Sequence, residues 1–313
     1  MPTRSFAVAS RLGLATAIVM FGLIVVGSVV RTTGSGLSCP DWPLCQGRLI
    51  PAFEFHVLIE WFHRLLALWV GLLLAMTVVH TAARAPLRAR LGALASVAVA
   101  LYLTQALLGA LTVWKLLNPI VVGSHLAVAL LLFSTLVAFT FVARRAAREQ
   151  QGPARAATSR PAGLLPMLGG TTALAYVQCL LGGMVSTNHA GLACPDWPLC
   201  NGSLVPTLAG PVGMQVMHRL GAYALTLAVM ATLVRARAAD GAVLRGVAAA
   251  FTLVAAQIAI GVTAIALQLP PWASALHLAN AALILITLLV TTLGAARLPA
   301  RAPLGASAPV AAA

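Results

Sequence analysis

Four of the seven histidines lie inside long apolar stretches, where an ionisable side chain is uncommon and usually functional. His63 and His218 are 155 residues apart, and His125 and His277 are 152 residues apart. A single histidine in such a stretch can simply hydrogen-bond a neighbouring carbonyl, but four in a two-by-two arrangement indicate a shared task. Two imidazoles on neighbouring helices can bind a metal-porphyrin from both faces. The four histidines are therefore candidate axial ligands of haem iron.

One carboxylate distinguishes the first pair of histidines from the second. Glu60 precedes His63 by three residues, so both side chains lie on one helix face, whereas Gln215 holds that position before His218. A carboxylate in a membrane helix is costly. A carboxylate can stabilise positive charge that develops on a carbon atom during its oxidation, or accept a proton released in that reaction. Glutamine can do neither. The alternative is a structural ion pair with Arg64, four residues further on.

A cysteine-bracketed loop occurs twice, as "GLSCPDWPLCQG" over 36–47 and "GLACPDWPLCNG" over 191–202. Two prolines and a turn-forming aspartate separate the cysteines of each loop, and a short bent loop in an oxidising compartment suits a local disulfide. A metal-binding thiol pair is the alternative, but the first loop has no histidine or further cysteine at ligand spacing. The predicted disulfides join Cys39 to Cys45 and Cys194 to Cys200.

The elements that must position these residues are membrane-spanning helices. The chain of 313 residues is 60% hydrophobic and only 8% charged, whereas a soluble domain has roughly 25% charged residues. An apolar run of about 20 residues crosses the hydrocarbon of a bilayer as a helix. The sequence predicts an all-α polytopic membrane protein with eight such runs, at about 12–31, 57–81, 90–113, 119–143, 163–185, 212–234, 243–267 and 272–295.

The basic residues predict the orientation of these helices. With the N-terminus inside, 15 of the 20 lysines and arginines fall on the inner side, so the positive-inside rule places both termini in the cytoplasm. Both cysteine loops then lie outside. The formal net charge of +14 is explained by this bias and by contact with anionic membrane lipid, and no basic domain is left to bind nucleic acid.

The repeated motifs divide the chain into two halves of four helices each. A charged linker over 144–160 separates residues 1–150 from residues 151–313. Because four is an even number, both halves enter the membrane in the same direction, and we expect two parallel-repeat four-helix bundles. The 152-residue offset that relates the second histidines also relates Gln105 to Gln257 and Gly109 to Gly261.

Together these features resemble the haem A synthase family of bacteria and mitochondria. The resemblance covers nearly the whole chain: eight helices in two halves, the cysteine loop, four helical histidines and the E-x-x-H motif, "EWFH" over 60–63. One difference is that the cysteine pair occurs in both halves here, whereas some members have it only in the first. The resemblance implies oxidation of a methyl group of haem O to a formyl group through successive hydroxylations. The product, haem A, serves terminal oxidases.

The resemblance also implies that one half holds a haem b cofactor while the other receives haem O. The Glu60 carboxylate favours the first half as the reaction site. We therefore assign haem O to His63 and His125, with Glu60 as the catalytic residue, and haem b to His218 and His277. Arg64 and Arg219 are candidate partners of haem propionates.

Further expectations concern partners and location. We expect haem O synthase and the cytochrome oxidase assembly machinery as partners. The reaction also requires an electron acceptor, which the residues do not identify. The lack of an N-terminal targeting segment favours a bacterial plasma membrane over a mitochondrion. One alternative is a di-haem electron-transfer protein of the cytochrome b type, which has no need for the Glu60 asymmetry. The other is a secondary transporter, which predicts interrupted helices with charged residues near the membrane midplane.

Overall fold

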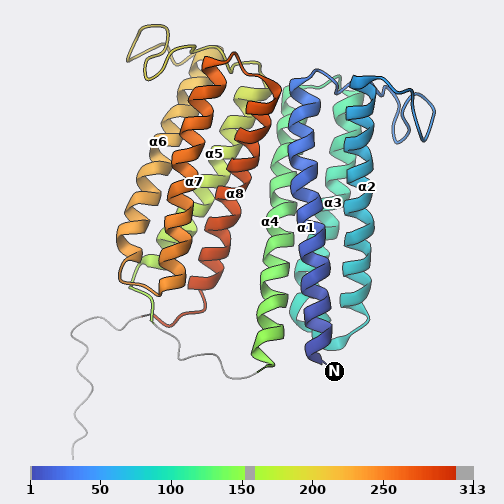
Figure 1. Cartoon of the computed structure of the whole chain (residues 1–313), viewed down its shortest axis with the longest axis vertical. Coiled ribbons are helices and arrows are strands. Elements are labelled where there is room, and N and C mark those ends of the chain that lie inside the picture. The colour runs from blue at the N-terminus through green and yellow to red at the C-terminus, as the bar shows by residue number, and fades with distance from the viewer. Residues whose placement is uncertain (1, 152–158, 301–313) are drawn as a thin grey trace, which may run out of the picture.

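The computed structural model describes residues 2–151 and 159–300, and most of them are helical (Figure 1). All eight predicted helices are present, and each is long and apolar enough to cross a membrane. Each is continuous between its ends, so the described residues do not show the interrupted helices that a transporter predicts. The helices are α1 (Pro2–Thr32), α2 (Phe55–Ala82), α3 (Ala85–Trp114), α4 (Pro119–Glu149), α5 (Leu164–Thr187), α6 (Gly210–Ala236), α7 (Gly241–Ala266) and α8 (Pro271–Ala295).

Several helices extend beyond their predicted apolar runs, α1, α3 and α4 by five residues or more. Helix α1 begins at Pro2 rather than near residue 12, and α4 continues from residue 143 to Glu149. Hydropathy marks only the part of a helix that lies in hydrocarbon, whereas backbone hydrogen bonds continue as long as side chains permit. The end of α4 is tied to α3, because Glu149 accepts hydrogen bonds from Arg145 at 3.0 Å and Arg90 at 2.6 Å. The predicted linker over 144–160 therefore starts inside a helix, and its part at 152–158 lies outside the described residues.

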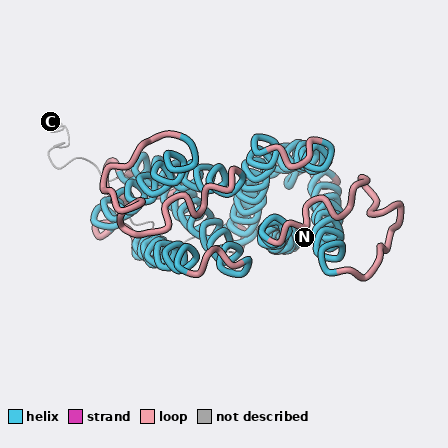
Figure 2. The backbone as a smooth tube through the Cα atoms, turned by 90° about the horizontal axis from the view of Figure 1, so that it is seen from above, coloured by secondary structure: helices cyan, strands magenta, loops and turns pink. Residues whose placement is uncertain are grey.

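The helices lie in two groups of four, α1–α4 and α5–α8, side by side (Figures 1 and 2). In the first group α1 packs on α2 and α4, and α3 packs on the same two helices; the second group repeats this ring with α5 and α7 against α6 and α8. Between the groups, α1 and α4 pack on α8, and α4 also packs on α5. Buried aliphatic side chains of both groups form one apolar cluster.

Equivalent threonine pairs join equivalent helices in the two groups. Thr16 Oγ1 of α1 lies 3.4 Å from Thr77 Oγ1 of α2, and Thr171 Oγ1 of α5 lies 3.1 Å from Thr232 Oγ1 of α6. The two pairs are related by the same 155-residue offset as the cysteine loops. Such hydrogen bonds are a common device for holding helices together in a membrane. They agree with the predicted parallel repeat, and the division at residue 150 stays a prediction.

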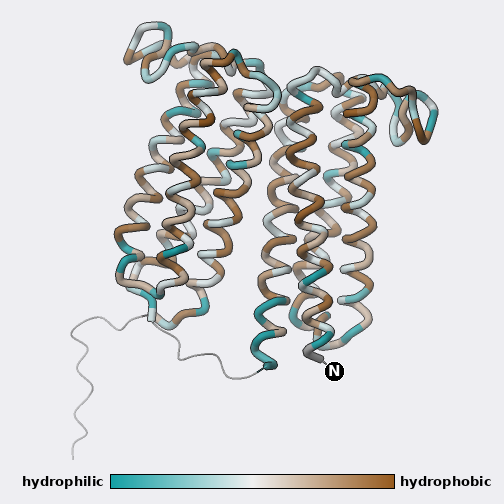
Figure 3. Tube along the Cα trace, in the orientation of Figure 1, coloured by the Kyte–Doolittle hydropathy of each residue, from teal (hydrophilic) through white to brown (hydrophobic). Residues whose placement is uncertain are grey.

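Polar residues mark the two ends of the helices. Figure 3 shows hydrophilic residues at the lower ends of α1 and α4 and in the loops, while the helices are largely apolar. Both cysteine loops extend from the same end of the molecule, which we call the loop side, and the N-terminus lies at the opposite end (Figure 1). The chain is a multi-pass membrane protein.

Candidate functional site

A single cavity of about 1350 Å³ reaches into both groups of helices. A typical small-molecule pocket has roughly 300–1,000 Å³, so this one exceeds the space that a single ligand of ordinary size requires. All eight helices contribute to its wall. The lining residues of the helices come from the parts nearer the loop side. The lining includes every predicted ligand, catalytic and propionate-binding residue: Glu60, His63, Arg64, His125, His218, Arg219 and His277, with Gln215.

Each of the four histidine rings lies against a glycine of a neighbouring helix. A Cβ atom added at Gly27 of α1 would lie 3.0 Å from Cε1 of His63, and one at Gly182 of α5 would lie 3.0 Å from Cε1 of His218. Such distances are shorter than ordinary van der Waals contact, so any larger residue would displace the ring. A Cβ atom added at Gly109 of α3 would lie 3.3 Å from Cε1 of His125, and one at Gly261 of α7 would lie 3.0 Å from Cε1 of His277.

The repeat in the sequence relates Gly109 to Gly261, but Gly27 and Gly182 were not predicted as part of the site. The 155-residue offset relates these two glycines and could have found them. Their role was not visible because a glycine in an apolar helix has many ordinary explanations, among them close helix packing. Only the position of the rings shows that all four glycines perform the same task.

The second pair of rings has the spacing of two axial ligands. The ring centres of His218 and His277 are 6.3 Å apart, with 68° between the ring planes. Metal–imidazole bonds of about 2 Å place two opposed ring centres roughly 6 Å apart, so this distance fits a metal ion held between the two rings.

The nitrogen atoms of the rings are also suited to binding iron. Nδ1 is buried without a hydrogen-bond partner in His63, His125 and His277, and a buried polar atom without a partner is costly. Neutral imidazole nitrogen is a common ligand of haem iron. The donor set, the glycine contacts and the size of the cavity therefore fit metal-porphyrin binding.

Glutamine side chains approach two of the histidines, each from the helix that also carries the contacting glycine. Gln105 Nε2 lies 3.2 Å from His125 Nε2, and Gln178 Nε2 lies 3.0 Å from His218 Nδ1 and 2.8 Å from the carbonyl oxygen of the same residue. Groups that bind the second nitrogen of a ligating histidine fix its orientation. The position in the first half that corresponds to Gln178 holds Leu23, so the surroundings of His63 and His218 differ.

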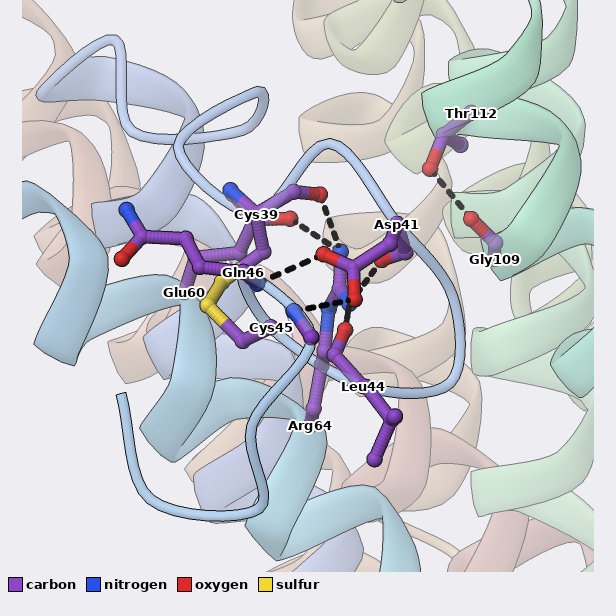
Figure 4. A network of polar contacts seen from close by, with 10 residues as sticks. Cys39, Asp41, Leu44, Cys45, Gln46, Glu60, Arg64, Gly109 and Thr112 are labelled. Atoms are coloured by element: carbon purple, nitrogen blue, oxygen red, sulfur yellow. Dashed lines mark hydrogen bonds and ion pairs between the residues drawn. A yellow bond between two sulfur atoms is a disulfide. The ribbon is translucent and has the colours of Figure 1, made fainter. Parts of the chain in front are cut away.

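Arg64 of α2 binds the first cysteine loop from below (Figure 4). Its Nη1 donates to the carbonyl oxygen of Asp41 at 2.6 Å and to that of Leu44, and its Nη2 donates to the carbonyl oxygen of Cys39 at 2.7 Å. The same Nη2 donates to Glu60 Oε1 at 2.7 Å, and Glu60 Oε2 accepts a hydrogen bond from the backbone N–H of Cys39 at 2.9 Å. Arginine and glutamate thus hold the loop together.

The structure therefore contains the Glu60–Arg64 ion pair that was the structural alternative for Glu60. The side chain of Glu60 is only 5% exposed and that of Arg64 is 15% exposed. The pair accounts for the placement of the carboxylate without any reaction, and the catalytic role of Glu60 stays a prediction. A propionate bound at either terminal nitrogen of Arg64 would have to compete with these contacts.

In the second loop, Arg219 binds two backbone carbonyls and Gln215 binds a third, without an ion pair between them. Arg219 donates from Nη1 to the carbonyl oxygen of Leu199 at 2.7 Å and from Nη2 to that of Cys194 at 2.7 Å. Gln215 Nε2 donates to the carbonyl oxygen of Gly191 at 3.3 Å, and its Oε1 has no partner. The Nε of Arg219 is also without a partner, so this guanidinium keeps one donor for another acceptor.

Both predicted disulfides are confirmed. Cys39 is bonded to Cys45 and Cys194 to Cys200, with Cα–Cα distances of 4.6 Å in each pair, within the usual range for a disulfide. The fifth cysteine, Cys179, is free and lines the cavity.

An aspartate closes each loop in the same way. Asp41 accepts hydrogen bonds from the backbone N–H groups of Gly47, at 2.8 Å, and Gln46, at 2.6 Å. These bonds, with that of Gly47 first, lower the pKa of Asp41 below its ordinary value because they stabilise the charged carboxylate. Asp196 has the same contacts with Gly202 and Asn201 in the second loop.

Comparison with known proteins gives a consistent match. Residues 10–289 match the family COX15-CtaA, described as cytochrome oxidase assembly protein. A protein of Symbiobacterium thermophilum named Heme A synthase is 34% identical over 253 residues, which cover 79% of this chain and 82% of that protein. The protein of the same name from Caulobacter sp. is 31% identical over 322 residues, with 87% of this chain and 91% of that protein covered.

Proposed function

This chain belongs to the COX15-CtaA family of cytochrome oxidase assembly proteins, and we propose that it acts by oxidising a methyl group of haem O to a formyl group. Its function is the synthesis of haem A for cytochrome oxidase. The observation that carries the proposed reaction is the combination of four histidines on one cavity with a carboxylate beside only the first pair.

The two halves have different tasks in this proposal. His63 and His125 bind the iron of the substrate haem O, while His218 and His277 bind haem b. Haem b, when bound, supplies one-electron redox chemistry. The ring spacing of 6.3 Å between His218 and His277 supports the second assignment, and the equivalent glycine contacts of His63 and His125 support the first. The unpaired Nε of Arg219 supports a contact with a propionate of haem b.

Glu60 makes the first half the reactive one. Two successive hydroxylations, each passing two electrons to an external acceptor and adding one hydroxyl group from water, would convert the methyl group to a gem-diol, which loses water to give the formyl group. Positive charge on the methyl carbon during oxidation is stabilised by a fixed carboxylate nearby, and a proton released there can be accepted at a Glu60 oxygen. Contacts with Arg64 and Cys39 fix that carboxylate in the wall of the cavity, and Gln215 offers no charge at the equivalent place.

We also propose that the loop side faces outward in a bacterial plasma membrane, with both termini in the cytoplasm. The distribution of arginines supports this orientation, since 15 of the 20 basic residues would then lie on the inner side. The disulfides of both loops agree with an oxidising outer compartment. Haem O synthase, as the source of the substrate, and the assembling cytochrome oxidase, as the consumer of the product, are the proposed partners.

Conversion of haem O in cells tests the reaction. The chain is expressed in a bacterial strain that makes haem O but no haem A, and the extracted haems are separated by chromatography. We expect haem A to appear with the natural sequence and to be strongly reduced by Glu60→Gln. Haem b bound to the protein without any haem A in the cells would contradict the proposal and favour an electron-transfer protein.

A further inference from the structure

Two arginines on the loop side line the cavity in the first half and have no counterpart in the second. Arg31 is in the last turn of α1, and Arg48 directly follows the first cysteine loop. The 155-residue offset places Ser186 and Ser203 at the corresponding positions. The first half therefore carries two cations at the cavity wall, whereas in the second half only Ser186 lines the cavity and Ser203 does not.

Neither guanidinium is used by the protein itself. Within residues 2–151 and 159–300, Arg31 and Arg48 donate no side-chain hydrogen bond and form no ion pair, whereas both terminal nitrogens of Arg64 donate to loop carbonyls or to Glu60. Arg31 is half-buried, whereas Arg48 is exposed and contributes to the cavity wall from the loop side. A guanidinium has five donors in a planar fork, and partial removal from water is costly unless acceptors replace the water. The cavity side of these arginines is thus suited to an anionic ligand.

Two general effects do not explain the pair. A cation at the C-terminal end of a helix is favoured by the helix dipole, which suits Arg31, but α5 ends at the equivalent place with Ser186. The orientation of the chain also disfavours cations on the loop side, since basic residues gather at the other ends of the helices. Arg31 and Arg48 are exceptions to that bias.

We propose that Arg31 and Arg48 bind the two propionate carboxylates of the porphyrin substrate in the first half. Guanidinium and carboxylate match as bidentate partners, with charge-assisted hydrogen bonds. This inference rests on the proposed function, in which His63 and His125 bind the substrate iron. The new element is the assignment of the carboxylate-binding residues.

The reaction gives a reason for this difference between the halves. A porphyrin held only by axial ligands can turn about the axis through its iron, and each turn would bring another substituent to Glu60. Two carboxylate contacts at one edge stop that rotation and present one methyl group to the carboxylate. A cofactor that only transfers electrons has no such requirement, which agrees with Ser186 and Ser203 in the second half. Arg31 and Arg48 are therefore positioning residues.

Binding of a porphyrin with and without free carboxylates tests the proposal. The full chain is purified with haem b in its second half, and iron protoporphyrin IX or its dimethyl ester is titrated in while absorbance is followed. The natural sequence should prefer the free diacid. Arg31→Gln and Arg48→Gln should each weaken binding of the diacid by about tenfold, the lower end of what a hydrogen bond to a charged group contributes, and should leave binding of the diester unchanged.

Lys115→Gln is the matched control. Lys115 is an exposed cation at the loop-side end of α3 and does not line the cavity, so its removal changes the net charge equally without changing the diacid preference. Arg31→Lys keeps the charge and should retain part of the preference, and haem b content measures folding in each variant. The proposal is overturned if the arginine variants bind both probes as the natural sequence does, lose both equally, or match Lys115→Gln.

A separate variant distinguishes this inference from the proposed function. His63→Ala should abolish binding of both the diacid and the diester to the first half. If both probes bind equally well to His63→Ala and to the natural sequence, or if neither binds to the natural sequence, the assignment of the substrate site is wrong. If His63→Ala abolishes binding but the arginine variants have no effect, only the carboxylate assignment is wrong.

Discussion

Replacement of Glu60 by glutamine separates a catalytic role from a structural one. The carboxylate makes two contacts, from Oε1 to Arg64 Nη2 at 2.7 Å and from Oε2 to the N–H of Cys39 at 2.9 Å. Glutamine is nearly isosteric and keeps one carbonyl oxygen, so it can retain one of them. The chain already holds glutamine at the equivalent place, Gln215, where Arg219 still binds its loop.

The cost in stability follows from these contacts. Breaking a buried ion pair by removing one partner typically costs 3–5 kcal/mol because the other charge is left alone. Arg64 keeps three carbonyl acceptors in the first loop, so its charge is not left alone. One charge-assisted hydrogen bond is lost, and we expect a loss of about 2 kcal/mol in the free energy of unfolding. The protein should fold and bind haem b.

The cost in rate should be larger than this loss explains. Removal of one group that stabilises charge in a transition state commonly lowers the rate about 10²-fold. The assay is conversion of bound haem O to haem A, followed by chromatography and expressed per molecule of protein that holds haem b. Gln215→Glu is the control, and it should not create a second reactive site because that half holds the cofactor. A Glu60→Gln rate within a few-fold of the natural one would refute the catalytic role and leave the ion pair as the explanation of Glu60.

Two further predictions concern the glycine contacts and the loops. Gly182→Ala should displace the ring of His218, because the added Cβ would lie 3.0 Å from Cε1 of that ring. Absorbance spectra should then show a lower haem b occupancy. Gly169→Ala on the same helix is the control, because its Cβ meets nothing within 4 Å, and it should leave haem b occupancy unchanged. The lowered pKa of Asp41 means that its stabilisation of the first loop is present above the ordinary pKa of aspartate and is lost as the pH falls through the lowered value. Protection of the Gly47 amide from hydrogen exchange, corrected for the intrinsic rate, should decrease in that acidic range. Asp41→Asn should remove most of this protection already at neutral pH. Full protection of the Gly47 amide in that variant would contradict the role of Asp41.

The fold was largely predictable because its determinants are local. Each apolar run is long enough to form a spanning helix by itself, and the number of runs places both cysteine loops on one side. The extension of α4 to Glu149 was not predictable from hydropathy, since it depends on Arg90 of another helix. The disulfides were predictable because each pair lies within one short loop.

The site was predictable in its residue types but not in its contacts. Repetition identified the four histidines, because few ordinary roles require ionisable residues at equivalent depths of two halves. The contact of each ring with a glycine depends on how neighbouring helices face each other, which spacing along one helix does not show. The contacts of Arg64 with loop carbonyls were not predictable either, because every residue has a backbone carbonyl and the sequence does not show which ones an arginine binds.

The haem content of the four histidine variants tests the division of tasks most directly. Each histidine is replaced by alanine, the protein is produced in cells that make haem O, and the haems of the purified protein are separated by chromatography. We expect His218→Ala and His277→Ala to lose haem b, and His63→Ala and His125→Ala to keep haem b and lose haem O and haem A. Loss of haem b from the first-half variants, with haem b unchanged in both second-half variants, would contradict this division of tasks.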